Sequence, residues 1–177
     1  TEERANHELH NFGKPPTTTN PGSGLFVSAH SLGMSRGCHI DLSMLGGLEV
    51  AENGDLANWM VPGKMVKVPG GAMDLVSGVK RVVVLMEHTA KDGASKILKS
   101  CSLPLTGKGV VNLIITDLCV FEVEAGKGLV LKELHPGVTL EDVMAKPDAT
   151  FRLARYPSHP QNRRIADRVA QLLFVRL

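Results

Sequence analysis

The chain has 177 residues, 43% of them hydrophobic, which is enough for one compact domain with a buried core. Only 4% of the residues are aromatic, whereas 18 are glycine and 10 are proline, so we expect aliphatic side chains packed between many turns, as in an α/β protein rather than a helical bundle. The net charge of +2 is unevenly divided, because residues 152–177 carry six arginines and one aspartate (+5), while residues 1–151 carry 14 basic and 17 acidic residues (−3). The body therefore lacks the basic surface of a nucleic-acid-binding protein.

The cysteines and the hydropathy pattern exclude several other classes. Cys38, Cys101 and Cys119 are isolated and show no C-x-x-C spacing, which argues against a disulfide scaffold or a metal site and indicates a reducing compartment. No apolar run reaches 18 residues, and residues 1–7 are too polar for a signal peptide. We expect a soluble protein that does not contact a membrane.

Taken in chain order, the apolar runs bounded by glycine, proline or polar residues predict a series of strands with a few helices. Residues 1–24 read as a loop with a short strand at 16–19, and the stretch after 25–28 reads as a glycine-rich connection. Helices are expected at 92–99, from Thr139 onward, where Thr139 can cap the helix, and at 165–175. The longer strands are predicted at 40–46 (buried), 48–50, 79–86 (central in the sheet), 110–116, 119–123 and 128–134.

A glycine-rich turn is the first candidate for chemistry. Lys64 and Lys67 precede Gly70 and Gly71, and glycines let backbone N–H groups approach a phosphate or an acyl oxygen closely. The alternative is an ordinary surface turn with solvated lysines.

Three other groups carry reactive side chains but have structural alternatives. Cys38 and His39 are adjacent, yet adjacent residues rarely point at each other, so a histidine that supports a turn is the competing interpretation. Glu87 and His88 follow the central strand, where open α/β sheets place ligands, and otherwise form a polar strand end. Finally, Asp55 and Asp74 are candidate general bases, and the alternative is that each of them caps a turn.

The chain carries five distinctive blocks in a fixed order, at 54–60, 62–67, 70–76, 86–91 and 103–107. They resemble the B-type, C-terminal half of the 3-oxoacid coenzyme A transferases, the succinyl-CoA:3-ketoacid type. This family occurs as one fused chain in mitochondria and as separate A-type and B-type subunits in bacteria. The resemblance implies an open, mostly parallel α/β sheet with flanking helices, an A-type partner subunit, and transfer of CoA from succinyl-CoA or a similar acyl-CoA to a 3-oxo acid. The CoA thioester is then the substrate, and no further cofactor or metal is implied.

The family's nucleophile is a glutamate in a Ser-Glu-Asn-Gly motif. It attacks the acyl-CoA thioester, forms an acyl-glutamyl anhydride and then carries CoA as an enzyme thioester. The motif precedes the segment that resembles residues 11–14, and residues 1–177 contain no copy of it. Glu52-Asn53-Gly54 spells a similar tripeptide but belongs to a later block, so we reject Glu52 as the nucleophile and leave the catalytic residue unassigned.

Register with the family assigns the remaining site residues. Lys14 resembles the lysine near CoA, Gly71 the glycine whose N–H faces the reacting carbonyl, and Met73 lies beside the same site, with Gly70, Glu87 and His88 as second-tier candidates. Departures from the family pattern are Pro15-Pro16, Val68-Pro69, Cys38 in place of glycine, and Leu113 in place of arginine.

The resemblance ends near Phe151, which sets the expected domain organisation. We expect a transferase B-type domain over residues 1–151 that lacks the nucleophile segment, and an arginine-rich extension over 152–177 that is either solvated or foreign to the domain. Alone, the chain is expected to be inactive or nearly so, and cytoplasmic in a bacterium rather than in the mitochondrial matrix. The alternatives are a non-catalytic relative that binds CoA or an A-type subunit, and an inactive gene remnant.

Overall fold

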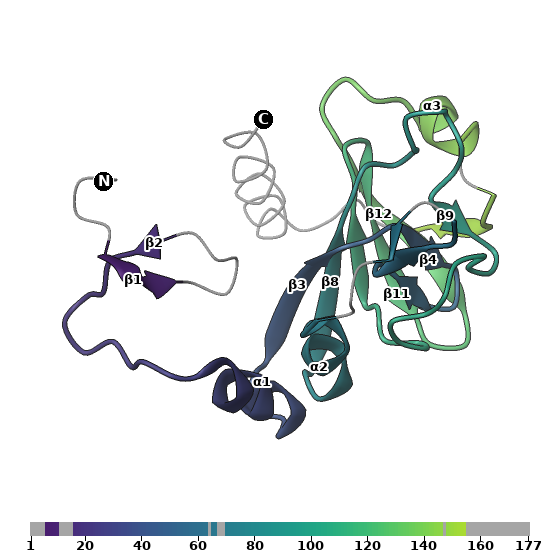
Figure 1. Ribbon diagram of the computed structural model, residues 1–177. Helices are drawn as coiled ribbons and strands as arrows, with labels where there is room; N and C mark the ends of the chain where they lie inside the picture. The colour runs from purple at the N-terminus through teal and green to yellow at the C-terminus, as the bar shows by residue number, and fades with distance from the viewer. Residues whose placement is uncertain (1–5, 11–15, 64, 67–69, 147, 155–177) are drawn as a thin grey trace.

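A computed structural model describes residues 6–10, 16–63, 65–66, 70–146 and 148–154. Its centre is a six-stranded sheet (Figure 1). Three of the five neighbouring pairs, β3–β8, β8–β10 and β12–β13, are parallel, and the two others are antiparallel. The expected open, mostly parallel sheet is therefore confirmed. In spatial order the strands are β13 (Phe151–Leu153), β12 (Gly128–Leu134), β11 (Cys119–Glu124), β10 (Leu113–Ile115), β8 (Arg81–Leu85) and β3 (Leu42–Gly46).

Smaller elements surround this sheet. A second sheet has the order β5 (Leu56–Ala57), β4 (Glu49–Ala51), β9 (Ile97–Leu98), and two ribbons pair β1 (Asn6–His10) with β2 (Pro16–Thr17) and β6 (Met60–Val61) with β7 (Met65–Val66). The helices are α1 (Ser28–Arg36), α2 (Ala72–Ser77) and α3 (Leu140–Met144). None of these helices in the described part of the chain is long and apolar enough to cross a bilayer.

The main core lies on one face of the six-stranded sheet. Val82, Val84 and Ile114 project from the central strands to this face and are at most 2% exposed. They pack with residues of the three-stranded sheet, α2 and α3, such as Val50 and Val143. A smaller cluster, Val83, Ile115 and Val120, lies on the opposite face. Because β8 is buried on both faces, it needs a continuous apolar run rather than an alternating pattern, as its sequence predicted.

Several predicted elements are confirmed with small shifts of their ends. The strands expected at 79–86, 110–116, 119–123 and 128–134 correspond to β8, β10, β11 and β12, and β8 is central as expected. Thr139 caps α3 in a full capping box: its hydroxyl accepts from the Asp142 N–H, and the Asp142 carboxylate accepts from the Thr139 N–H. The helix expected at 165–175 lies outside the described residues.

Three expectations are wrong. The connection expected after residue 28 is helix α1, which includes a glycine and is held by packing against α2. The helix expected at 92–99 is a set of turns ending in β9, because Ile97 pairs with Val50 of β4 and is completely buried. The strand at 40–46 is not fully buried: as β3 it is an edge strand, and its burial alternates along the chain.

Candidate functional site

The carboxyl ends of three parallel strands, β3, β8 and β10, meet at one edge of the large sheet. Gly46 ends β3, Glu87 and His88 follow β8, and Asp117 follows β10. Asn58 reaches this edge from the segment after β5, since its side-chain amide donates to the Gly46 carbonyl at 3.0 Å. In open α/β sheets this is the edge where ligands bind.

His88 is the most enclosed polar residue of this edge, with 1% of its surface exposed. Its backbone N–H donates to Asp117 Oδ1 at 2.7 Å, and its ring Nδ1 lies 3.1 Å from Thr116 Oγ1 and 3.9 Å from Cys119 Sγ. Nε2 has no hydrogen-bond partner among the described residues. Burial lowers the pKa of His88 and outweighs the nearby Asp117 carboxylate, so the ring is neutral at pH 7.

Glu87 is exposed beside His88, and a half-buried lysine lies near it. The backbone N–H of Lys96 donates to the His88 carbonyl at 3.4 Å. Burial lowers the pKa of Lys96, while the carboxylates of Glu87 and Asp117 act in the opposite direction. This edge therefore combines two exposed carboxylates, one partly desolvated amine and one neutral imidazole.

The second group of candidate residues lies where α2 begins. Gly71 is the residue that precedes α2, with φ −83° and ψ 4°, and its carbonyl accepts from the Leu75 N–H at 2.9 Å. Among the described residues none accepts a hydrogen bond from the Gly71 N–H. Gly70 has φ +54°, a left-handed conformation that suits glycine, and Met73 is 41% exposed. The turn therefore presents a backbone N–H beside an exposed thioether.

Contacts with α1 and β3 hold α2 in place. Asp74 pairs with Arg36 of α1 at 2.7 Å, and Ser43 of β3 donates its hydroxyl to the Leu75 carbonyl at 2.8 Å. Asp74, one of the residues considered as a general base, is thus engaged with an arginine. The side chain of Asp55, the other, accepts from the Gly109 N–H and the Asn53 amide, which makes it a turn-stabilising residue.

The structure thus separates the predicted site residues into two groups. Gly70, Gly71 and Met73 lie together at the start of α2, and Glu87 and His88 lie together after β8. No hydrogen bond between described residues joins one group to the other. Lys14, and also Lys64, Lys67 and Pro69, lie outside the described residues, so the roles assigned to them stay predictions.

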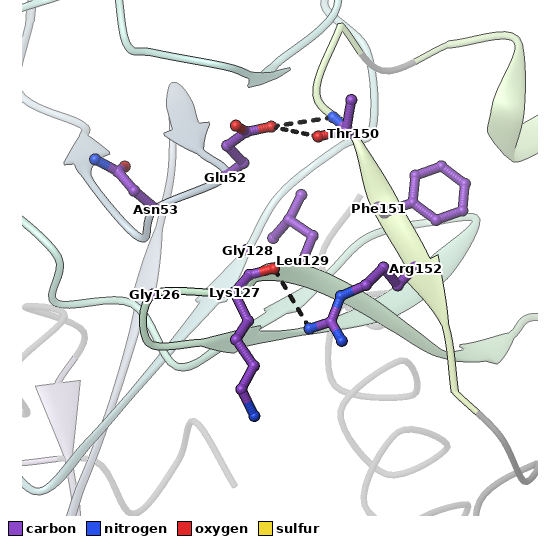
Figure 2. A pocket seen from close by; sticks show the side chains of 9 residues that line it. All are labelled: Glu52, Asn53, Gly126, Lys127, Gly128, Leu129, Thr150, Phe151 and Arg152. Atoms are coloured by element: carbon purple, nitrogen blue, oxygen red, sulfur yellow. Dashed lines mark hydrogen bonds between the residues drawn. The ribbon is translucent and has the colours of Figure 1, made fainter.

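Glu52 lies in a different place, at the turn between β4 and β5. Its carboxylate accepts from both the N–H and the hydroxyl of Thr150, at 3.1 and 2.9 Å (Figure 2). These residues line a cavity of about 440 Å³ together with Lys127 and Arg152. The charges around it are paired within the chain, since Arg152 donates to the Glu124 carboxylate and to the Lys127 carbonyl. Glu52 therefore has a structural role: its hydrogen bonds connect the β4–β5 turn to the residue that precedes β13.

Cys38 and His39 do not form a nucleophilic pair. Cys38 is exposed and has φ +62°, and the backbone N–H of His39 donates to the Met34 carbonyl, which is the turn arrangement that competed with the catalytic interpretation. Burial raises the pKa of Cys101 to about 11 and that of Cys119 to about 12, so both thiols stay protonated. No group of three candidate metal ligands occurs among the described residues.

Sequence reasoning missed Asp117, Thr116, Lys96 and Asn58. Thr116 and Asp117 follow β10 as Glu87 and His88 follow β8, so the rule that selected the second pair would also have selected the first. No local signal marks Lys96 or Asn58, because their neighbours at this edge come from other segments of the chain.

The chain is similar in sequence to known proteins over most of its length. A family model described as "Coenzyme A transferase" matches residues 1–146. A Bacillus subtilis protein, described as the B-type subunit of a probable succinyl-CoA:3-ketoacid coenzyme A transferase, is 56% identical over 148 residues, which are 84% of this chain and 68% of that protein. Human mitochondrial succinyl-CoA:3-ketoacid coenzyme A transferase 2 is 48% identical over 155 residues, 87% of this chain but 30% of its own length.

The fold is also found in a solved structure. An acyl-CoA transferase from Escherichia coli O157:H7, in a thioester complex with CoA, superposes with a TM-score of 0.66 at 22% identity. The match covers 75% of this chain and 30% of that one, and at this identity it supports the fold alone. Given the family model and the high identity to B-type subunits, the chain belongs to the coenzyme A transferase family, in the succinyl-CoA:3-ketoacid branch and on its B-type side.

Proposed function

We propose that the chain is the B-type part of a CoA transferase that works with an A-type subunit. In this reaction CoA moves from succinyl-CoA, or a similar acyl-CoA, to a 3-oxo acid. The observation that carries the proposal is the 56% identity over 148 residues to a bacterial B-type subunit, a match that includes all five blocks noted in the sequence. The CoA thioester is the substrate, and no other cofactor takes part.

Lys14, Gly71 and Met73 are the proposed CoA-transfer residues. A lysine ammonium suits a phosphate or a carboxylate, and a glycine N–H suits an oxygen that gains negative charge. Two observations support the second role: the Gly71 N–H has no acceptor among the described residues, and Met73 beside it is exposed. Gly70 would shape the turn, while Glu87 and His88 would act at the neighbouring strand ends.

The covalent step needs a glutamate that residues 1–177 do not supply. Glu52 is not assigned this role, because it belongs to a later block of the family pattern and its Oε2 accepts from the N–H and the hydroxyl of Thr150. Removing a covalent nucleophile lowers turnover by about a million-fold. Residues 1–177 alone are therefore proposed to bind CoA without transferring it at a measurable rate.

Calorimetry with CoA tests the binding part of the proposal. We expect heat from the wild-type chain, and about tenfold weaker binding by Lys14→Ala, which corresponds to about 1.4 kcal/mol. Lys127→Ala is the matched control, because Lys127 is an exposed lysine at the β11–β12 turn and should not matter. No heat from the wild-type chain would overturn the proposal, and equal affinity of all three proteins would remove Lys14 from the site.

Borohydride trapping tests the nucleophile. The chain is mixed with succinyl-CoA and the A-type subunit that partners the Bacillus subtilis relative, then reduced and examined by mass spectrometry. We expect no reduced glutamate in residues 1–177. A reduced glutamate on this chain, lost in Glu52→Gln, would show that the rejection of Glu52 is wrong. Heat with CoA together with no trapping is the result that the proposal expects of residues 1–177.

A further inference from the structure

One lysine beside the strand ends differs from every other lysine in the described part of the chain. Among those lysines only Lys96 and Lys132 are half-buried, and the rest are exposed. Lys132 forms an ion pair with Glu122, whereas no carboxylate of the described residues forms an ion pair with Lys96. Lys96 is thus the described lysine that is both partly shielded from water and unpaired.

Hydrogen bonds on both sides fix the backbone from which the Lys96 side chain starts. Lys96 directly precedes β9, and β9 lies beside β4 (Figure 1). The Lys96 carbonyl accepts from the Val50 N–H of β4 at 2.9 Å, and the Lys96 N–H donates to the His88 carbonyl at 3.4 Å. The next residue, Ile97, is completely buried. The Lys96 backbone is therefore held between β4 and the segment that follows β8.

Two carboxylates act on the Lys96 amine without forming an ion pair with it. Burial has the largest effect and lowers the pKa of Lys96, while Glu87, which follows β8, and Asp117, which follows β10, oppose this shift. At the exposed Lys80 the opposite holds, because hydrogen bonding to Asp41 raises its pKa. The neutral amine is the nucleophilic form of lysine, and partial desolvation increases its share near neutral pH.

We propose that Lys96 is a site of covalent acylation by short acyl-CoA thioesters. The neutral Nζ attacks the thioester carbonyl carbon, and the resulting adduct expels the sulfur of CoA. A C–N bond forms, the C–S bond breaks, and the proton that Nζ gives up ends on the CoA thiol. The products are an amide on Lys96 and free CoA, and nothing is oxidised or reduced. The step requires no A-type subunit and no glutamate nucleophile, so it does not depend on the function proposed above.

Acylation of Lys96 changes the charge at the ligand-binding edge of the sheet. The ammonium becomes a neutral amide, so one positive charge is lost near Glu87 and Asp117. The edge then has a more negative potential, which disfavours anionic ligands there. An acyl-CoA that accumulates would in this way modify the surface beside His88.

Site-resolved mass spectrometry after incubation with acetyl-CoA tests the proposal. At about pH 7.5, Lys96 should be acetylated at least about threefold faster than Lys91 and Lys99, which are exposed lysines of the same stretch. Lys96→Arg keeps a positive charge but cannot form the amide, so it should lose this site and leave the rates at Lys91 and Lys99 unchanged. Circular dichroism checks that the variant is folded.

Glu87→Gln tests the electrostatic part of the proposal. Without this carboxylate the pKa of Lys96 falls further, so its acetylation should become about twofold faster while that of Lys99 stays the same. Glu141→Gln is the matched control, because Glu141 is an exposed glutamate of α3 and is not among the groups that shift the pKa of Lys96. It should leave the Lys96 rate unchanged.

Two results would overturn the acylation site while the proposed function stands. One is acetylation of Lys96 no faster than that of Lys91 and Lys99, and the other is an equal effect of Glu87→Gln on Lys96 and Lys99. Failure of the CoA titration would instead remove the proposed function and leave the preference for Lys96 in place, because the amine reacts with the thioester in solution.

Discussion

Cys38 occupies a backbone conformation that is unfavourable for any residue other than glycine. It is the only described non-glycine residue with positive φ, at +62°, and it follows α1 at a position where the family resemblance expects glycine. The left-handed conformation costs an L-residue about 1 kcal/mol or more. The adjacent N–H groups of Gly37 and His39 close the helix end on Gly33 and Met34, so the turn cannot relax without losing them.

Cys38→Gly should therefore raise the free energy of unfolding by about 1 kcal/mol, because glycine adopts this conformation without strain. Cys38→Ala is the control: it also removes the thiol but keeps a Cβ, so its stability should stay close to that of the wild type. Urea unfolding measures both. If the alanine variant gained as much as the glycine variant, the thiol rather than the backbone would be responsible.

Protonation of His88, which follows the carboxyl end of β8, links the stability of the fold to pH. Its surroundings disfavour the charged ring, and because its folded pKa lies below the unfolded value of about 6.5, the unfolded chain binds more protons as the pH falls below that value. The stabilisation from neutral His88 is thus complete above pH 6.5 and is lost as the pH falls toward the folded pKa. The groups that face it are Thr116, Asp117, Cys119, Phe121 and Lys146.

We expect the wild-type chain to lose stability as the pH falls below 6.5 because of this residue. His88→Asn retains a polar group near Thr116 but cannot titrate, so it should be less stable at pH 7 and show a flatter dependence on pH. Denaturant unfolding at a series of pH values gives both slopes. Parallel curves for the two proteins would show that His88 does not titrate differently in the folded state.

At the scale of elements, the contact between α1 and the α2–β8 turn depends on one missing side chain. A Cβ placed on Gly78 would lie 2.2 Å from the Ser35 carbonyl oxygen and 2.6 Å from that of Arg36, and backbone atoms cannot move aside as a flexible side chain can. This close approach lets α1 cover α2 despite its weak helical pattern. The helix is therefore held by tertiary contact more than by its own sequence.

Gly78→Ala should lower the free energy of unfolding by at least about 2 kcal/mol through this clash. The same substitution at Gly33, inside α1, meets only the end of the Arg36 side chain at 3.7 Å and should stabilise the helix by up to about 1 kcal/mol. Thermal unfolding followed by circular dichroism should thus move in opposite directions for the two variants. A similar shift for both would rule out the backbone contact as the cause.

At the scale of the whole molecule, contacts with the large sheet extend past the expected boundary between domain and extension. The expected boundary at residue 151 falls inside β13, whose residues pair with β12 from Phe151 to Leu153. Phe151 also packs against Phe121, with ring centroids 5.2 Å apart. The Ala154 N–H still donates to the Leu131 carbonyl. These contacts place residues 151–154 with the sheet, whereas the role of the following residues stays a prediction.

A chain that ends at Ala154 should unfold cooperatively within about 2 °C of the full chain, if residues 155–177 add little to the domain. It loses five arginines and one aspartate, so its net charge changes from +2 to −2. A chain that ends at Thr150 also loses Phe151 and should be about 3 kcal/mol less stable. Scanning calorimetry compares the three chains, and loss of cooperative unfolding in the Ala154 form would make the extension part of the domain.

The sequence by itself determined the family, the α/β class, the strands of the large sheet and the Thr139 cap. Those features are local: β8, β11 and β12 are apolar through their own side chains, and a capping box needs only residues three positions apart. The five family blocks were equally readable, since each is a continuous run of residues.

Only the tertiary structure decided α1, the exposed face of β3, the strand at Ile97, and the neighbours of His88 and Glu52. Each of these depends on residues that are distant in sequence, such as Arg36 with Asp74 or Glu52 with Thr150. A helix with little amphipathic character forms when another element packs against it. A buried segment becomes a strand when it can form hydrogen bonds with the edge of a neighbouring strand. Such energies belong to pairs of segments, and no single stretch of sequence contains them.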